Sequence, residues 1–124
     1  MLRTHDCGEL RLEDLGKRVT LAGWVRFRRD HGGVLFFDLA DSHGTTQLVL
    51  DPEALRREID QKRLSGTLNS VGREYVIKVT GVIRGRVPGT EDPRNPTGMV
   101  EVLIEEAELL NTSRPIPFEV AEQK

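Results

Sequence analysis

An aromatic side chain lies on the polar face of a predicted strand, where a core residue is not expected. In the segment 34–41, the apolar residues at 35, 37 and 39 share one face, and Phe36 shares the other with Asp38, because side chains alternate along a strand. The basic run Arg26–Arg29 precedes this strand. A ring beside arginines is an arrangement that stacks nucleic-acid bases. The alternative is that Phe36 packs under a loop or against another domain.

The neighbouring strands add polar side chains to the same outer face. Arginine binds phosphate, an aromatic ring stacks on a base, and amides and carboxylates bond base edges, so this combination suits a splayed single strand. Each residue alone is ordinary surface chemistry, but together they favour a nucleic-acid-binding face. The outward residues that alternation predicts are Trp24, Arg26, Arg28, Phe36, Asp38, Thr45, Gln47, Lys78, Thr80, Arg84, Arg86, Glu101 and Glu105.

Motifs for catalysis or metal binding do not occur in the sequence. Gly32-Gly33 fits a hairpin turn and is not followed by the Lys-Ser or Lys-Thr of a phosphate-binding loop, and the three histidines lack metal-ligand spacing. Ser42 beside His43 has no third group to orient it. Cys7, the only cysteine, is predicted to be structural rather than reactive. We therefore expect a binding protein without a metal or cofactor of its own.

Composition is that of a soluble globular domain. The 124 residues are 37% hydrophobic and 31% charged, with a net charge of −2 that argues weakly against nucleic acid. The arginines are clustered, however, which allows local binding of a short, shaped RNA. No apolar run is long enough to cross a membrane, and the N-terminus has neither a signal-peptide nor a transit-peptide pattern. The single cysteine makes a reducing cytoplasm the expected location.

Five strands and one main helix are predicted, in the order three strands, helix, two strands. Hairpin turns with glycines join the first three strands. The helix is predicted from Pro52 to about Arg63, with Asp51 as N-cap, an end or kink at Ser65-Gly66, and Leu55, Ile59 and Leu64 on one side. A short helix is also expected between Leu10 and Gly16. The predicted strands are 18–29, 34–41, 45–50, 75–86 and 99–109, with a long loop over 87–98.

This order is that of an all-β fold with one inserted helix, the five-stranded Greek-key barrel called the OB-fold. Gly23, in the middle of the long first strand, favours the barrel because that strand must bend to serve two sheets. A small open α+β sheet is the alternative. We assign residues 1–110 to the barrel and 111–124 to a linker, since the apolar, extended segment 114–118 has nothing of its own to pack on. A strap folded back over the barrel is the other interpretation of this tail.

Motifs spread over nearly the whole chain closely resemble the N-terminal domain of bacterial aspartyl-tRNA synthetase. The related lysyl and asparaginyl enzymes share the Gly-Trp-Val and Phe-x-Asp-Leu elements, but they lack the Arg-Thr-His opening followed by Cys-Gly-Glu-Leu. The matching segments are 3–5, 7–10, 19–25, 28–33, Phe36, Asp38-Leu39, Asp41, Gly44, Gln47, Asp51-Pro52, 75–77, Gly81, Arg84, Arg86, 96–98, Glu101-Val102, Leu110-Asn111 and 115–118.

The resemblance implies an OB-fold that binds the anticodon stem-loop of tRNA(Asp). In the family, the position of Phe36 stacks on the central anticodon uridine and that of Gln47 bonds its edge. Arg29, Arg86 and Glu101 stand where family residues contact flanking bases and backbone. Alternation places Arg29 inward, but a bulge could turn it. The predicted RNA-binding residues are Arg26, Arg28, Arg29, His31, Phe36, Gln47, Arg84, Arg86, Gly89 and Glu101.

The resemblance also bears on specificity. His31 and Gly89 match relatives that charge both tRNA(Asp) and tRNA(Asn) with aspartate, whereas discriminating relatives carry Leu and Lys there. Both residues can equally be explained as turn and loop residues. Phe27 and Ala40 stand where arginine is usual in the family, which weakens the expected backbone contacts.

The catalytic domain of the family, with its three class II motifs and its ATP and Mg²⁺ sites, is absent from these residues. The resemblance thus implies a chain that binds tRNA but does not aminoacylate it, with a linker that leads toward a catalytic domain. If the chain is a fragment, its parent is expected to be a homodimeric, ATP-dependent aspartate–tRNA ligase. The alternatives are a stand-alone OB-fold that binds tRNA or single-stranded nucleic acid, and an OB-fold in which Phe36 contacts a protein.

Overall fold

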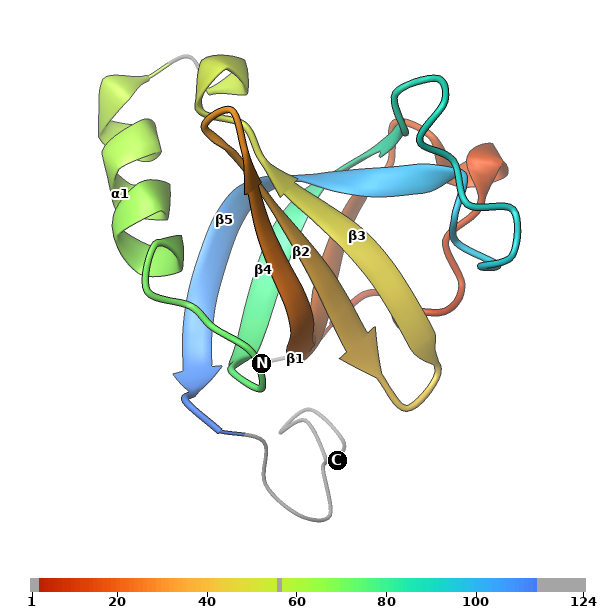
Figure 1. The fold of residues 1–124 in the computed structure, drawn as a ribbon, viewed down its shortest axis with the longest axis horizontal. Helices are drawn as coiled ribbons and strands as arrows, with labels where there is room; N and C mark the ends of the chain where they lie inside the picture. The colour runs from red at the N-terminus through yellow and green to blue at the C-terminus, as the bar shows by residue number, and fades with distance from the viewer. Residues whose placement is uncertain (1–2, 56, 114–124) are drawn as a thin grey trace.

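Five strands close into a barrel in the order β1-β2-β3-β5-β4 (Figure 1). This computed structural model describes residues 3–55 and 57–113. It confirms the predicted OB-fold and excludes the open α+β sheet. Beyond residue 113, the predicted linker lies outside the described residues. The strands are β1 (Arg18–His31), β2 (Val34–Asp41), β3 (Gly44–Leu50), β4 (Val76–Gly85) and β5 (Val100–Asn111).

The long strand β1 serves both halves of the barrel, as predicted. Its first half, to Trp24, pairs with β4, and its second half, from Trp24, pairs with β2. At Gly23 the two backbones come so close that a Cβ atom would lie 2.1 Å from the carbonyl oxygen of Ala40. The pairing with β2 shifts register between Val25 and Phe27, which marks a β-bulge. The strand can therefore turn the corner between two sheets.

The barrel closes between β3 and β5. This parallel pairing has only two registered pairs, Leu48 with Val102 and Val49 with Leu103. The β4–β5 pairing, by contrast, runs along nearly the whole of both strands. Inward-facing side chains from all five strands form one hydrophobic core.

The N-terminal segment seals part of this core through Cys7, whose side chain is fully buried. The backbone N–H of Cys7 donates to Asp41 Oδ2 (2.9 Å), and Thr46 Oγ1 donates to the Cys7 carbonyl (2.7 Å). Burial, with the Asp41 carboxylate close by, raises the pKa of the Cys7 thiol. The placement agrees with a structural role.

The predicted helix was wrong in both bounds. Asp51 does accept a hydrogen bond from the Glu53 N–H (3.1 Å), but this cap begins only a 3₁₀ turn, Pro52–Ala54. The α-helix α1 (Glu58–Leu68) begins later and runs through Ser65-Gly66 without ending there. It packs on the core through Leu64 and Leu68. Leu55 also packs there, but Ile59 is 60% exposed, contrary to prediction.

The short helix expected near the N-terminus is a single 3₁₀ turn, Leu12–Asp14. Gly16 follows it with a φ of +86°, a value that favours glycine, and its N–H donates to the Ile83 carbonyl (2.8 Å). None of the helices in the described part of the chain is both long and apolar enough to cross a membrane.

Candidate nucleic-acid interface

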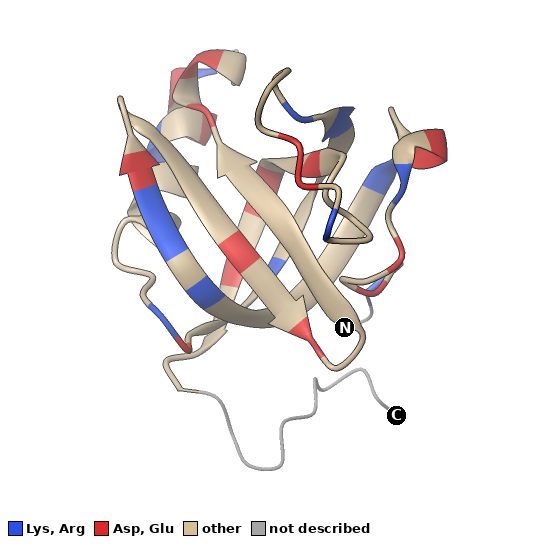
Figure 2. Ribbon diagram, turned by 45° about the vertical axis from the view of Figure 1, so that its right-hand side comes forward, with Lys and Arg blue, Asp and Glu red and all other residues tan. Residues whose placement is uncertain are grey.

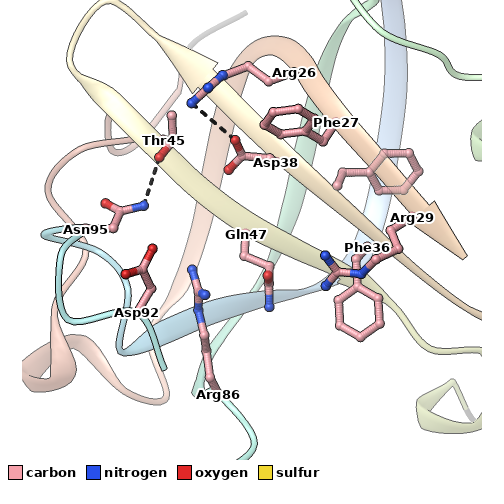
Figure 3. A pocket seen from close by; sticks show the side chains of 11 residues that line it. Arg26, Phe27, Arg29, Phe36, Asp38, Thr45, Gln47, Arg86, Asp92 and Asn95 are labelled. Atoms are coloured by element: carbon pink, nitrogen blue, oxygen red, sulfur yellow. Dashed lines mark hydrogen bonds and ion pairs between the residues drawn. The ribbon is translucent and has the colours of Figure 1, made fainter. Parts of the chain in front are cut away.

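Two adjoining grooves lie on the outer face of the barrel. The first, of about 330 Å³, is drawn in Figure 3, and the second, of about 400 Å³, continues toward the β1–β2 turn and the loop after β4. Four residues line both grooves, and all four were predicted from the sequence to bind RNA. They are Arg29, Phe36, Gln47 and Arg86.

The bulge in β1 creates this junction, because it reverses the alternation after Val25. Arg29 becomes the register partner of Phe36 on β2, and its guanidinium carbon lies 5.0 Å from the centroid of the Phe36 ring. Phe36 is half-buried, with Arg29 beside it. Figure 2 shows the basic end of β1 running beside β2. The predicted outer-face position of Phe36 and the bulge that turns Arg29 are both confirmed.

Gln47 is held by a buried carboxylate. Its Nε2 donates to Glu101 Oε1 (2.8 Å), and Arg84 Nε donates to Glu101 Oε2 (2.8 Å). Glu101 lies on the outer face, as predicted, and lines the second groove, but its side chain is only 2% exposed. Because Nε2 faces Glu101, the Oε1 atom of Gln47 is left to accept a hydrogen bond. Glu101, which is itself held by Arg84, therefore fixes the orientation of the Gln47 side-chain amide.

The loop between β4 and β5 forms the far wall of the first groove. At its start, Arg86 Nε donates to the Val100 carbonyl (3.1 Å). Further along, Asn95 Nδ2 donates to Thr45 Oγ1 (3.0 Å) and Thr97 Oγ1 donates to the Thr45 carbonyl (2.5 Å). These bonds fix the loop against β3 and keep the groove open beside Gln47.

A carboxylate and a second aromatic ring line the near side of the first groove. Asp38 Oδ2 lies 3.4 Å from Arg26 Nη1, and Phe27 is 54% exposed. Burial raises the pKa of Asp38, while the positive charges of Arg26 and Arg86 act in the opposite direction. With its other lining residues, the first groove combines three phenylalanine rings, three guanidinium groups and two carboxylates.

Three predicted site residues do not line either groove. Arg28 was predicted to face outward, which was wrong: the bulge turns it toward α1, where Nη1 donates to the carbonyls of Asn69 (2.6 Å) and Val71 (2.7 Å). Arg84 pairs with Glu101 through its Nε atom. Gly89 lies between two residues that line the second groove, Val87 and Thr90. Its φ of +95° is a backbone conformation that favours glycine, which is enough to explain the residue type at this position.

Two further predicted residues occupy the ends of the interface. Arg26 lines the first groove and the exposed His31 lines the second. Sequence reasoning missed other lining residues, because alternation placed Phe27 inward and the loop had no recognisable pattern beyond its polar composition. The missed residues are Phe27, Phe37, Val87, Thr90, Asp92 and Asn95. The described residues contain no group of His, Cys, Asp and Glu side chains that could hold a metal ion.

Curated proteins similar to this chain are aspartate–tRNA(Asp/Asn) ligases. Those of Pseudarthrobacter chlorophenolicus and Thermotoga neapolitana are 46% and 48% identical to it, over 98% and 95% of this chain respectively. The matches cover 18% and 19% of those ligases, so the chain spans less than a fifth of their length. The sequence resemblance to aspartyl-tRNA synthetases is confirmed.

Solved structures agree in fold. Asparaginyl-tRNA synthetase from Pyrococcus horikoshii, complexed with asparaginyl-adenylate, matches with a TM-score of 0.67 and 31% identity over 90% of this chain and 23% of that one. The OBody AM2EP06, bound to hen egg-white lysozyme, has a TM-score of 0.73 at 22% identity, over 91% of this chain and 97% of its own, and supports the fold alone. A family model for tRNA anticodon proteins, described as an OB-fold nucleic acid binding domain, matches residues 19–110. The chain therefore belongs to this family of OB-fold nucleic acid binding domains.

Proposed function

We propose that this chain binds the anticodon stem-loop of tRNA(Asp), and also of tRNA(Asn), as the anticodon-recognition domain of an aspartate–tRNA ligase. The observation that carries the proposal is the junction of the two grooves, where Arg29, Phe36, Gln47 and Arg86 meet. The relatives named as aspartate–tRNA(Asp/Asn) ligases support the choice of RNA. Aminoacylation, its ATP and Mg²⁺ and the homodimer contacts belong, in this proposal, to the rest of such an enzyme.

The central anticodon uridine stacks on the half-buried Phe36 ring. Gln47 Oε1 then accepts a hydrogen bond from N3–H of the uracil, since Glu101 holds the amide with its other end inward. Arg29 and Arg86 lie at the same junction, where their positive charges balance the phosphates on either side of the stacked base. The flanking nucleotides enter the first and second grooves.

Relaxed specificity arises from the second groove. The third anticodon base is cytidine in tRNA(Asp) and uridine in tRNA(Asn). The exposed His31 can donate or accept a hydrogen bond, so it suits either pyrimidine edge. At Gly89, no atom lies within 4 Å of the place where a Cβ would be, and glycine brings no cationic side chain into this space. Neither pyrimidine is therefore rejected by a clash or an unpaired charge.

The experiment is a fluorescence-anisotropy titration of the parent chain and Phe36→Ala with three stem-loops. Two carry GUC and GUU anticodons, and the third carries adenine at the centre. We expect the parent to bind the GUC and GUU loops within about tenfold of each other, a difference of roughly 1.4 kcal/mol, and to bind the third less tightly. Because stacking contributes about 1–3 kcal/mol per base, Phe36→Ala should weaken binding about tenfold.

Leu12→Ala is the matched control, since Leu12 is an exposed apolar residue outside both grooves. It should bind as the parent does, and circular dichroism should show that both variants are folded. Equal affinities of Phe36→Ala and the parent for the GUC loop would contradict anticodon recognition by this face. A preference of a hundredfold or more for GUC over GUU would contradict only the inclusion of tRNA(Asn).

A further inference from the structure

Phe27 presents a second aromatic ring on the outer face. It is 54% exposed and lines the first groove together with Phe36. Its position depends on the bulge after Val25, which makes Phe27 the register partner of Asp38 instead of an inward-facing residue. Such an exposed ring in a polar groove is not explained by the core, because the buried cluster does not include it.

Two guanidinium groups restrain the Phe27 ring. The guanidinium carbon of Arg26 lies 5.1 Å from the ring centroid and that of Arg73 lies 6.0 Å from it. Both arginines are themselves anchored: Arg73 Nε donates to the Arg26 carbonyl (3.0 Å), and Arg26 pairs with Asp38. In a cation–π contact the cation lies over a face of the ring, so these two contacts restrict how the ring can turn. The ring is therefore oriented before any ligand arrives.

The two phenylalanines occupy strand positions that suit neighbouring nucleotides. Phe27 is opposite Asp38 and Phe36 is opposite Arg29, so the two phenylalanines are diagonal neighbours across β1 and β2. Diagonal positions of an antiparallel pair are about 7–8 Å apart, a distance that one nucleotide step of a splayed strand can span. In Figure 3, Phe27 lies next to Arg26 and Asp38, while Phe36 lies next to Arg29.

We propose that Phe27 is a second stacking platform, which takes the base of the nucleotide adjacent to the one on Phe36. The inference rests on the proposed function and adds a contact to it. The Asp38 carboxylate beside the ring repels phosphate, so a base and not the backbone enters here, and its oxygens can accept from an exocyclic amino group. Arg26 and Arg73, whose guanidinium groups lie over the ring, supply positive charge for the sugar–phosphate chain of that nucleotide.

The test is a mutant–ligand cycle with the 124-residue chain. Phe27→Ala, Phe27→Leu, Phe36→Ala and the control Leu12→Ala are titrated with the GUC stem-loop and with two versions of it, abasic on the 5′ or on the 3′ side of the central uridine. We expect Phe27→Ala and Phe27→Leu each to weaken binding of the intact loop about fivefold or more, because both remove the π face. With one of the two abasic loops, this loss should disappear.

A direct readout comes from Phe27→Trp. The introduced indole should be quenched when the intact loop binds, and less so with the abasic loop that abolishes the Phe27→Ala effect. The parent, which contains only Trp24, gives the background signal.

The outcomes separate this inference from the proposed function. If Phe36→Ala weakens binding while Phe27→Ala and Phe27→Leu leave it unchanged, the second platform is overturned and anticodon binding stands. A loss in Phe27→Ala that persists in full with both abasic loops also overturns it, since the ring then does not stack on either neighbouring base. If the parent binds no stem-loop, the proposed function and this inference both fail.

Discussion

Glu101 accepts hydrogen bonds from Gln47 and Arg84, and it is the most deeply buried acidic residue in the described part of the chain. Each of its two oxygens accepts one hydrogen bond from a neighbouring side chain. If the chain recognises the anticodon as proposed, we expect Glu101 to act through Gln47, whose Nε2 it holds inward. A buried charge paired with hydrogen-bond donors is costly to disturb, because an unsatisfied partner is left behind.

Replacing Glu101 by Gln should therefore change base preference as well as stability. The new amide can satisfy Arg84 with its oxygen and then presents an NH₂ group to Gln47, which must turn its own oxygen inward. Gln47 then offers a donor to the groove, which suits N3 of cytidine and not N3–H of uridine. We expect the preference for a central uridine over cytidine to fall or reverse, with a stability loss of about 1–3 kcal/mol.

The measurements are urea unfolding and titration with stem-loops that differ only in the central base. Glu105→Gln is the matched control on the same strand, because Glu105 forms a surface ion pair with Arg18. Glu105→Gln should lower the free energy of unfolding by at most about 1 kcal/mol and leave the preference for the central base unchanged. An unchanged preference for uridine in Glu101→Gln would show that Glu101 does not set the orientation of Gln47.

At this scale, alternation predicted Phe36, Gln47 and Arg86 from the sequence, since each lies on a regularly paired strand or at its end. It failed for Arg28 and Phe27. Both lie after the bulge. Because Phe27 is apolar and Arg28 is cationic, the sequence also fits an unbroken strand in which Phe27 points inward and Arg28 points outward. The burial of Glu101 was also not predictable, because it depends on Gln47 and Arg84 from two other strands.

At the scale of elements, the strands were predicted because apolar alternation and glycine turns are local properties of the sequence. The bulge in β1 has no such local pattern, since no glycine or proline occurs between Trp24 and His31. The helix was misplaced for a related reason: Asp51, Pro52 and Glu53 form a proper N-terminal cap, but a single 3₁₀ turn satisfies it. The position of α1 depends instead on where Leu64 and Leu68 reach the core.

Two glycines should respond in opposite ways to alanine. Gly66 lies within α1, and no atom lies within 4 Å of the place where its Cβ would be, so Gly66→Ala should stabilise the chain by about 0.5–1 kcal/mol. At Gly23 a Cβ would meet the Ala40 carbonyl at 2.1 Å, so Gly23→Ala should destabilise it by about 1–3 kcal/mol or more. Thermal and urea unfolding check both; a destabilising Gly66→Ala would mean that the helix does end at Ser65-Gly66.

At the scale of the whole molecule, Cys7 reports on the integrity of the barrel. Burial raises the pKa of its thiol, so both the thiolate fraction and the access of a reagent are low in the folded state. We expect labelling by a thiol reagent at pH 8 to be slower than in urea by orders of magnitude. Gly23→Ala should speed it, whereas Phe27→Ala, a surface change, should not.

The rate of this labelling also distinguishes two kinds of opening. The ratio of the labelling rates in the unfolded and native chains gives a free energy of opening at Cys7. If Cys7 reacts only through global unfolding, this value equals the free energy of unfolding measured with urea. A smaller value would mean that the N-terminal segment detaches from Asp41 and Thr46 while the barrel stays closed. Rapid labelling of the native chain, at the rate seen in urea, would contradict the burial of Cys7.

The two short pairs between β3 and β5 have a kinetic consequence. They join residues about fifty positions apart in the chain, so the entropy of closing that long intervening loop opposes their formation. Gln47 and Glu101 stand on the two sides of this junction. A folding intermediate with β3 and β5 still apart can keep its arginines and attract phosphate, but it has no oriented amide. If Gln47 binds the anticodon as proposed, we expect base selectivity to arise in the step that closes the barrel, and bound RNA to stabilise the pairing of β3 with β5.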